Sequence, residues 1–412
     1  MPTTIVQNVH VIDTALEHPL PNASLVIENG RIREVAKEAP HLKDAIVFDG
    51  NGLYALPGLI DCHTHPTLTQ LNLRALEDVP QTLMAARAAN ILNDMLMRGF
   101  TSIRDAAGAD WGLKTAVEEG AIIGPRMFIS GRALSQTGGH GDVRSRTDVH
   151  VPCACESALA GMTEFADGVD DIRKSVRELF RQGADQIKIM VSGGVASPND
   201  PLECNQYSPE EIETVVEEAH RRESYVMAHA YGADAIKVAL HAGVRSIEHG
   251  TLVNQEAAEL AHAKGAFVVP TLTMPIHLLQ DKDGGQALPA FASENLNRIR
   301  NEGFRAIDIW KKAGVKLGFG TDLLGDTYHL QSQEFLHRAE VESPRDVLHS
   351  ATRVNAEILQ MEGVLGVIAE GAIADLILVD GNPVDDLTYL QHQGRHLKLI
   401  MKQGTVVKNE LH

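Results

Sequence analysis

The chain has 412 residues, of which 44% are hydrophobic, and its formal net charge at pH 7 is −18. This length and this apolar content can supply a large core, with room for one large α/β barrel and a smaller module. The excess of acidic residues, without a long basic run, argues against nucleic acid and anionic membranes as partners.

The amino terminus carries no recognisable targeting signal. Residues 1–6 lack a basic stretch followed by an apolar core, and no run in the chain reaches the roughly 18 apolar residues of a membrane span. We therefore expect a cytoplasmic protein. The chain has four cysteines, too few for a disulfide framework at this length. Cys153 and Cys155 lack the two-residue spacer of a zinc knuckle, so we interpret them as buried or loop thiols.

Alternating apolar residues predict short strands near both ends of the chain, at residues 4–12, 23–32, 45–50, 374–383 and 397–407. Asn29-Gly30 is typical of a two-residue hairpin turn, because both central positions of such a turn require positive φ. Strand-rich flanks on either side of a larger domain predict one small β-sandwich, built from residues 1–56 and 357–412.

From about residue 54 the pattern changes to short apolar strands separated by helical segments, which is typical of a parallel sheet covered by helices. Eight strands are predicted, near residues 54–62, 100–105, 126–132, 185–191, 225–229, 244–248, 266–271 and 315–321. Helical periodicity covers residues 76–97, 172–181, 209–221 and 294–312. Eight such units fit a closed (β/α)8 barrel over residues 57–356 better than an open sheet. The long insertions after strands three and seven are candidates for covering the barrel mouth.

Two histidines with one residue between them, His63 and His65, end the first barrel strand. Side chains alternate along a strand, so both imidazoles can project to the same point, which suggests a divalent metal. Since the chain has 19 histidines, a pair of this kind can also arise by chance. Its weight depends on further ligands at other strand ends.

Four other predicted strands carry a polar residue at or near their carboxyl ends: Lys188, His229, His249 and Asp322. Lys188 lies inside an apolar strand, where an unpaired ammonium is costly, so it must be paired with a carboxylate, neutral or chemically modified. Each residue alone is more often structural. Because the carboxyl ends of barrel strands face one pocket, we expect these side chains to meet there. Four imidazoles, a lysine and an aspartate are too many for one tetrahedral ion and suit two adjacent metals.

These motifs resemble the amidohydrolase superfamily, whose members have a metal-bearing barrel and often a β-sandwich made from both chain ends. The resemblance rests on the stretch Pro57 to His65, on the strand-end residues named above and on Gly320-Thr321-Asp322. It implies that His63, His65 and Asp322 bind one divalent ion, with zinc expected, and that His229 and His249 bind a second. It also implies that CO2 converts Lys188 to N6-carboxylysine, which would bridge the two ions.

Within the superfamily, residues 186–195 and 227–232 resemble the branch related to imidazolonepropionase, which contains metal-dependent prolidases and other dipeptidases. The resemblance implies hydrolysis of the amide bond of dipeptides, above all Xaa-Pro, by a metal-bridged hydroxide. Asp322 is the expected general base and acid. Alternatives are hydrolysis of Xaa-Arg or Xaa-Lys dipeptides, of N-acyl amino acids, or of cyclic amides such as imidazolonepropionate. A different alternative is a barrel scaffold without catalytic activity.

The free carboxylate of a small-molecule substrate such as a dipeptide needs hydrogen-bond donors. Tyr231, two residues after His229, is a candidate, although a packing role explains it equally well. His140 in the glycine-rich loop after strand three is a second candidate, and Arg144 is a third. The glycines of the loop that begins at Ser192 either let the backbone approach the ligand closely or simply allow an ordinary turn. A homo-oligomer is expected.

Overall fold

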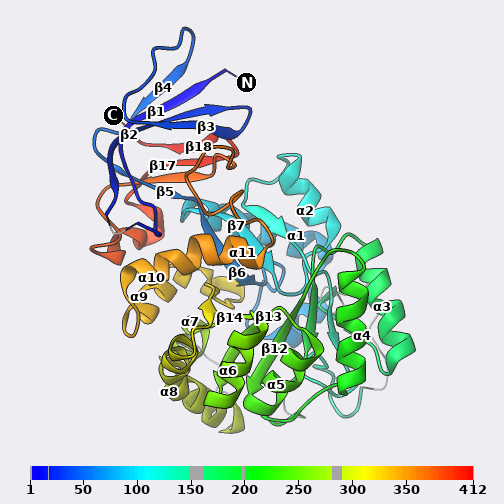
Figure 1. The fold of residues 1–412 in the computed structure, drawn as a ribbon. Helices are drawn as coiled ribbons and strands as arrows, with labels where there is room; N and C mark the ends of the chain where they lie inside the picture. Colours follow the sequence, from blue (N-terminus) through cyan, green and yellow to red (C-terminus); the bar gives the residue numbers. More distant parts are fainter. Residues whose placement is uncertain (1, 17, 149–160, 196–199, 281–289, 412) are drawn as a thin grey trace.

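The computed structural model describes residues 2–16, 18–148, 161–195, 200–280 and 290–411. In Figure 1, a small β domain that contains both chain ends lies against a larger α/β barrel. The predicted fold class is therefore confirmed. Cys153, Cys155 and parts of the insertions predicted to cover the barrel mouth lie outside the described residues.

The β domain joins strands from the two ends of the chain in one sheet. Its strands are β1 (Thr4–Val11), β2 (Leu20–Glu28), β3 (Arg31–Ala36), β4 (Ile46–Asp49), β5 (Tyr54–Pro57), β16 (Leu376–Val379), β17 (Leu397–Lys402) and β18 (Thr405–Asn409). The order is β18-β17-β16-β5-β1-β2-β3, with β4 beside β1. Antiparallel pairing of β5 with β16 joins the two ends. Side chains from both ends, including Val6, Leu25, Leu378 and Met401, share one core.

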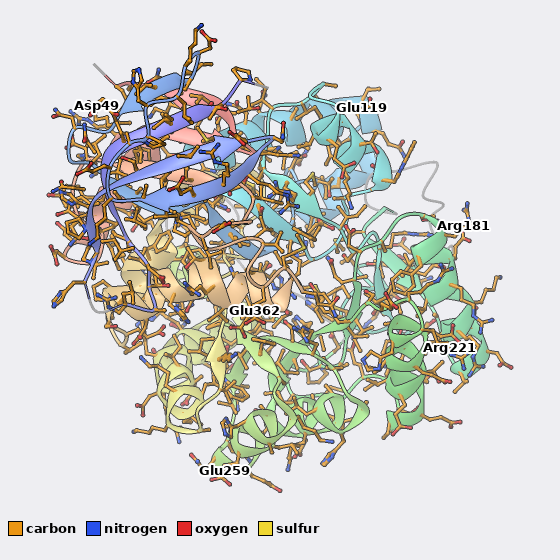
Figure 2. The ribbon with its side chains drawn as sticks, turned by 45° about the horizontal axis from the view of Figure 1, so that its top comes forward. Asp49, Glu119, Arg181, Arg221, Glu259 and Glu362 are labelled. Carbon is orange, nitrogen blue, oxygen red and sulfur yellow. The ribbon has the colours of Figure 1, made fainter. Side chains whose placement is uncertain are left out.

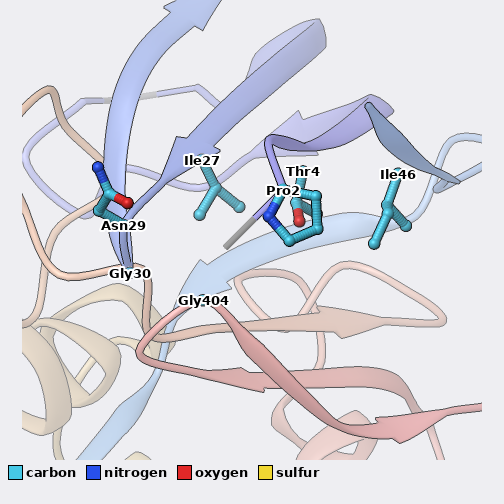
Figure 3. Close-up of a pocket in the computed structure, with 7 residues that line it drawn as sticks. All are labelled: Pro2, Thr4, Ile27, Asn29, Gly30, Ile46 and Gly404. Atoms are coloured by element: carbon cyan, nitrogen blue, oxygen red, sulfur yellow. The ribbon is translucent and has the colours of Figure 1, made fainter. Parts of the chain in front are cut away.

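The hairpin turn predicted at Asn29-Gly30 connects β2 to β3 and has φ values of 52° and 76° at its two residues. A small cavity of about 140 Å³ lies near this turn (Figure 3). It is lined by Pro2, Thr4, Ile27, Asn29, Gly30, Ile46 and Gly404. None of these side chains is ionisable, so the cavity offers no group for acid–base or metal chemistry.

The barrel has a strand at each of the eight predicted positions. Its strands are β6 (Leu59–Thr64), β7 (Phe100–Asp105), β8 (Arg126–Phe128), β9 (Ala133–Ser135), β11 (Ile187–Met190), β12 (Val226–Gly232), β13 (Ser246–Leu252), β14 (Phe267–Val269) and β15 (Lys316–Leu317), and β10 (Thr163–Phe165) pairs with β9. The strands pair in parallel. The first and last strands close the barrel, because Cys62 N–H donates to the Phe319 carbonyl at 2.8 Å.

Helices cover the outside of the barrel strands (Figure 1). The α-helices are α1 (Gln81–Met97), α2 (Trp111–Glu118), α3 (Val169–Arg181), α4 (Pro209–His220), α5 (Ala233–Ala242), α6 (Gln255–Lys264), α7 (Thr273–Gln280), α8 (Ala290–Lys312), α9 (Gln333–Ala339), α10 (Pro344–His349) and α11 (Asn355–Ile358). Shorter helical turns are η1 (Leu73–Asp78), η3 (Gly325–Leu330), η4 (Ser350–Val354), η5 (Leu387–Leu390) and η6 (His392–Gly394). Charged side chains such as Arg181, Arg221 and Glu259 point outward from these helices (Figure 2). Among the described residues, no helix combines the length and apolarity needed to cross a membrane.

Several predicted boundaries differ from the structure, and two of the differences have a clear local cause. The helix predicted over residues 76–97 begins only at Gln81, because Pro80 favours an extended residue before it, and Val79 has φ −90° and ψ 117°. The strand predicted over 54–62 is two strands, β5 in the β domain and β6 in the barrel, divided at Gly58. Gly58 N–H donates to the Asp375 carbonyl at 2.9 Å, so this position turns the chain from one sheet into the other.

Gly58 provides a test of this junction. A Cβ at residue 58 would lie 2.0 Å from Thr101 Oγ1 and 2.8 Å from Thr101 Cβ, so rotation of the Thr101 side chain cannot remove the overlap. We expect Gly58→Ala to reduce the free energy of unfolding by about 1–3 kcal/mol, the usual range for overpacking. Denaturant unfolding measures this change. Gly161→Ala is the control, because a Cβ there meets nothing within 4 Å. Equal stabilities of the two variants would contradict the prediction.

Candidate metal centre

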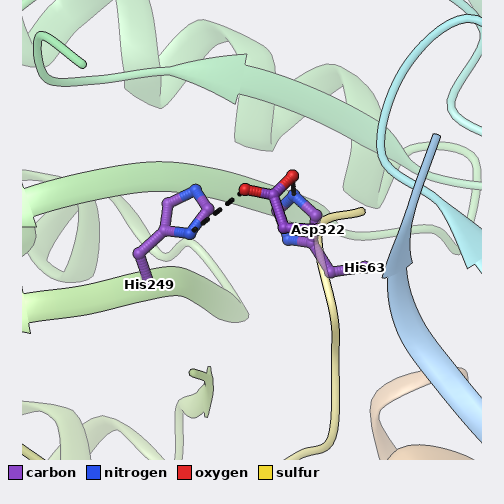
Figure 4. Close-up of side chains that lie close together, drawn as sticks. All are labelled: His63, His249 and Asp322. Atoms are coloured by element: carbon purple, nitrogen blue, oxygen red, sulfur yellow. Dashed lines mark ion pairs between the residues drawn. The ribbon is translucent and has the colours of Figure 1, made fainter. Parts of the chain in front are cut away.

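The strand ends bring the predicted residues together around Asp322. His63 lies in β6, Lys188 in β11, His229 in β12 and His249 in β13. His65 directly follows β6, and Asp322 lies in the segment that comes after β15. Asp322 Oδ1 lies 3.4 Å from His63 Nε2 and 3.2 Å from His65 Nε2, and Asp322 Oδ2 lies 4.0 Å from His249 Nδ1. One ligand atom each from His63, His249 and Asp322 can be chosen so that all lie within 4.8 Å of one another (Figure 4). These three segments, far apart in sequence, thus form a possible metal-binding site.

His229 extends the cluster. Its ring centroid lies 4.7 Å from that of His249. Lys188 belongs to the same cluster, because it interacts electrostatically with Asp322 and His249. It is 1% exposed. Burial lowers the pKa of Lys188 to about 8, although Glu248 and Asp322 favour its charged form.

Two residues of the cluster have left-handed backbones, which allow them to leave the strand alternation. His249 has φ 68° and Asp322 has φ 55°. In a regular strand, Glu248 and His249 would point to opposite faces. The left-handed backbone of His249 redirects its side chain, so that Glu248 and His249 both approach His63. Such conformations are uncommon outside glycine and concentrate at functional sites.

Each of the four histidines has one ring nitrogen fixed by a protein group. His63 Nδ1 lies 2.7 Å from Glu248 Oε2, and His65 Nδ1 lies 3.1 Å from the Ala107 carbonyl. His229 Nε2 lies 3.0 Å from the Gly193 carbonyl, and His249 Nδ1 lies 2.8 Å from Thr271 Oγ1. In each ring this leaves the other nitrogen for a ligand. Metal-binding histidines almost always have such a second partner, which fixes their tautomer and orientation.

The charges of the cluster also suit a divalent cation. Burial lowers the pKa values of His65, His229 and His249, which favours the neutral imidazole that binds metals. Burial alone would raise the pKa of Asp322, but His63 and His65 hold it well below its usual value. The cluster therefore offers neutral nitrogen donors around an ionised carboxylate, a donor set that fits zinc or a similar ion.

Sequence reasoning missed Glu248 and Arg104, which lie under His63. Both side chains are completely buried, and Arg104 Nη2 lies 2.8 Å from Glu248 Oε1. A signal was present, since each is an ionisable residue in an apolar strand, as Lys188 is. In a regular strand Glu248 would point to the face opposite His249, so the strand pattern gives no reason to place both at the site.

Two of the three predicted substrate-binding residues contact the cluster. His140 stacks on His229, with ring centroids 4.3 Å apart and planes inclined by 20°. Tyr231 stacks on His249 at 4.9 Å and meets the edge of His229 at 5.0 Å. Arg144 instead forms an ion pair with Asp142, with Nη2 and Oδ2 2.6 Å apart, and covers the ring of Phe165. Its charge is therefore engaged within its own loop.

The glycine-rich loop after β11 meets His140. A Cβ at Gly194 would lie 1.9 Å from His140 Cε1, so glycine is required for the ring to occupy this place. Among the described residues, neither His140 Nδ1 nor Asp200 Oδ1 has a hydrogen-bond partner although both are buried, and His140 Nδ1 lies 3.8 Å from Asp200 Oδ2. Burial lowers the pKa of His140 to about 4. His140 is thus held as a neutral imidazole at the edge of the cluster.

Comparison with known proteins agrees with this geometry. Residues 54–407 match the amidohydrolase family. The chain belongs to the amidohydrolase family. The predicted resemblance is confirmed, and the protein is a hydrolase of a family that is generally metal-dependent and acts on small molecules.

Individual amidohydrolases are similar over nearly the whole chain. Ochratoxinase of Aspergillus niger is 33% identical over 407 residues, which cover 95% of this chain and 84% of that protein. The crystal structure of another amidohydrolase is 46% identical, with a TM-score of 0.96 and complete coverage of both chains. A prolidase in complex with N-methylphosphonate-L-proline is also 46% identical, with a TM-score of 0.95, and the match covers 99% of this chain and 100% of the prolidase.

Proposed function

We propose that this protein is a binuclear metal-dependent dipeptidase that hydrolyses the amide bond of Xaa-Pro dipeptides. The observation that carries the proposal is the similarity, over 99% of the chain, to a prolidase in complex with N-methylphosphonate-L-proline. The strand ends support it. His63, His249 and Asp322 form a possible metal site, and together with His65, Lys188 and His229 they give six candidate ligands, which suit two ions better than one.

In the proposed centre, His63, His65 and Asp322 hold one ion and His229 and His249 hold the other, with zinc as the expected metal. Two such ions supply Lewis acidity and lower the pKa of a water molecule. Lys188, once carbamylated by CO2, would supply a further carboxylate ligand. Carbamylation requires the neutral amine, and burial favours this form by lowering the pKa of Lys188 to about 8.

Asp322 is proposed to carry the proton of the reaction. Its carboxylate accepts a proton from the attacking water and passes it to the amide nitrogen, since the amine cannot leave as an anion. Its side chain is 26% exposed, whereas that of His63 is 1% exposed, so Asp322 is the member of this pair that a substrate can reach. Tyr231 and His140, stacked on His249 and His229, are proposed to orient the substrate. We also propose Arg144 as a third substrate contact. It is the weakest of the three candidates, because its guanidinium already pairs with Asp142.

A second candidate is the hydrolysis of another amide by the same centre, such as an N-acyl amino acid. The observation that favours a second activity is the 33% identity to a relative named ochratoxinase rather than prolidase. Residues that orient the leaving group, rather than the metal ligands, would distinguish the two activities.

A substrate panel tests the proposal. Purified protein loaded with zinc is assayed with Xaa-Pro, Xaa-Arg and Xaa-Lys dipeptides and with N-acyl amino acids. We expect the highest kcat/KM for Xaa-Pro. Asp322→Asn protein, purified in parallel, controls for contaminating peptidases. Turnover of other substrates without turnover of Xaa-Pro would refute the prolidase activity, and no turnover of any amide would favour the scaffold alternative.

Metal analysis tests the ligand set. We expect about two zinc ions per wild-type chain, the count of a two-metal site, and fewer in His63→Asn and Lys188→Ala because each variant removes a proposed ligand. Elemental analysis of protein dialysed against metal-free buffer gives the count. His220→Asn is the control, since His220 is exposed on α4. Wild-type occupancy in both ligand variants would show that the assignments are wrong.

Asp322→Asn tests the proton-transfer role. The amide oxygen can still face the metals but the side chain no longer accepts a proton, so turnover should fall by about 10²–10⁴, the usual contribution of a positioned acid or base. Steady-state kinetics and metal analysis are done on the same preparation. A variant that retains metal and wild-type turnover would exclude Asp322 as the proton carrier.

A further inference from the structure

A buried ion pair lies directly beneath the candidate metal centre. Arg104 in β7 and Glu248 in β13 are completely buried, and Arg104 Nη2 lies 2.8 Å from Glu248 Oε1. Arg104 Nε donates to the Cys62 carbonyl at 2.7 Å, and the Ser246 hydroxyl donates to Glu248 Oε1. Strands β6, β7 and β13 therefore fix the pair from three directions.

The geometry makes this an ion pair. A guanidinium stays protonated in proteins, and Glu248 Oε1 accepts hydrogen bonds from both Arg104 Nη2 and the Ser246 hydroxyl. Buried ion pairs seldom add net stability, because the cost of removing two charges from water offsets their attraction. Stability therefore does not explain the pair, and the second carboxylate oxygen, Glu248 Oε2, indicates another role.

That second oxygen is engaged with His63. Glu248 Oε2 lies 2.7 Å from His63 Nδ1. An ionised carboxylate can only accept hydrogen bonds, so Nδ1 must carry a hydrogen, and in the neutral imidazole that binds metals Nε2 then keeps its lone pair. His63 Nε2 is the nitrogen that faces Asp322, at 3.4 Å. The ion pair thus selects the tautomer of His63 that can bind a metal through Nε2.

We propose that Glu248, fixed by Arg104, is a positioning residue that holds His63 in its metal-binding tautomer and thereby strengthens zinc binding. This inference rests on the proposed metal centre. Partners of this kind, which bind the second nitrogen of a metal-ligating histidine, usually contribute 10–100-fold to metal affinity. Glu248 acts through His63 and does not contact the ions.

Glu248→Gln is the decisive variant. Beside Arg104, the glutamine places its amide oxygen toward the guanidinium and its NH2 group toward His63. The NH2 group can only donate, so His63 would carry its hydrogen on Nε2 and lose the lone pair that binds the metal. We expect zinc affinity, measured by competition with a chelator, to fall by about 10–100-fold. In metal-free protein, 15N NMR of the histidine rings should show His63 change tautomer, with His63→Asn used for assignment.

Glu342→Gln is the matched control. Glu342 also forms an ion pair with a completely buried arginine, since its Oε2 lies 2.5 Å from Arg338 Nε. Its ion-pair partners, Arg338 and Lys311, are not histidines of the cluster. This variant tests the general effect of neutralising a buried Arg–Glu pair and should bind zinc as the wild type does. Unfolding measurements on both variants separate loss of stability from loss of metal binding.

Glu248→Asp provides a second variant if the glutamine protein does not fold. It keeps the charge beside Arg104 but draws the carboxylate back from His63, so zinc affinity should again fall. Wild-type zinc affinity in a folded Glu248 variant would overturn the inference. A wild-type protein that binds no zinc would instead overturn the proposed metal centre, so the two failures are distinguishable.

Discussion

The seam between the first and last barrel strands determines whether the cluster can form. His63 and Asp322 are 259 positions apart in the chain, and Asp322 N–H donates to the His63 carbonyl at 2.9 Å across this seam. The buried carboxylate of Asp61 stabilises this seam from the core side. It accepts hydrogen bonds from Thr321 Oγ1 at 2.7 Å and from Gln331 Nε2 at 3.0 Å. Burial raises the pKa of Asp61 to about 6. The register of one strand pair therefore sets the distance between the two residues that begin and complete the site.

Buried charge is concentrated where the barrel must hold polar groups in fixed positions. Arg338 donates to the Gly318 carbonyl at 2.6 Å and pairs with Glu342, as Arg104 donates to the Cys62 carbonyl and pairs with Glu248. In both cases a buried guanidinium satisfies a carbonyl near a strand end that leads to the cluster. Five fixed donors allow one arginine to do this and to bind a carboxylate, which a lysine cannot do with the same geometry.

Much of the fold and the six strand-end residues could be predicted because the relevant signals are local. An apolar run that ends in histidine or aspartate identifies both the strand and the end of the strand, and barrel geometry then gathers those ends. The second layer could not be derived in the same way. Glu248 and His249 can face the site together only because the left-handed backbone of His249 redirects its side chain, and no local pattern of residue types reveals this. The division of one predicted strand at Gly58 likewise depends on the distant Asp375 and Thr101.

The candidate substrate contacts are not independent of the candidate metal ligands. His140 and Tyr231 lie flat against His229 and His249, so the imidazoles that are candidate metal ligands also support the candidate substrate-binding residues. Gly194 permits this packing, since any side chain there would displace His140. Specificity in this barrel would thus change most readily in residues beyond the stacked pair, because a substitution at His140 or Tyr231 also alters the support of a metal-binding ring.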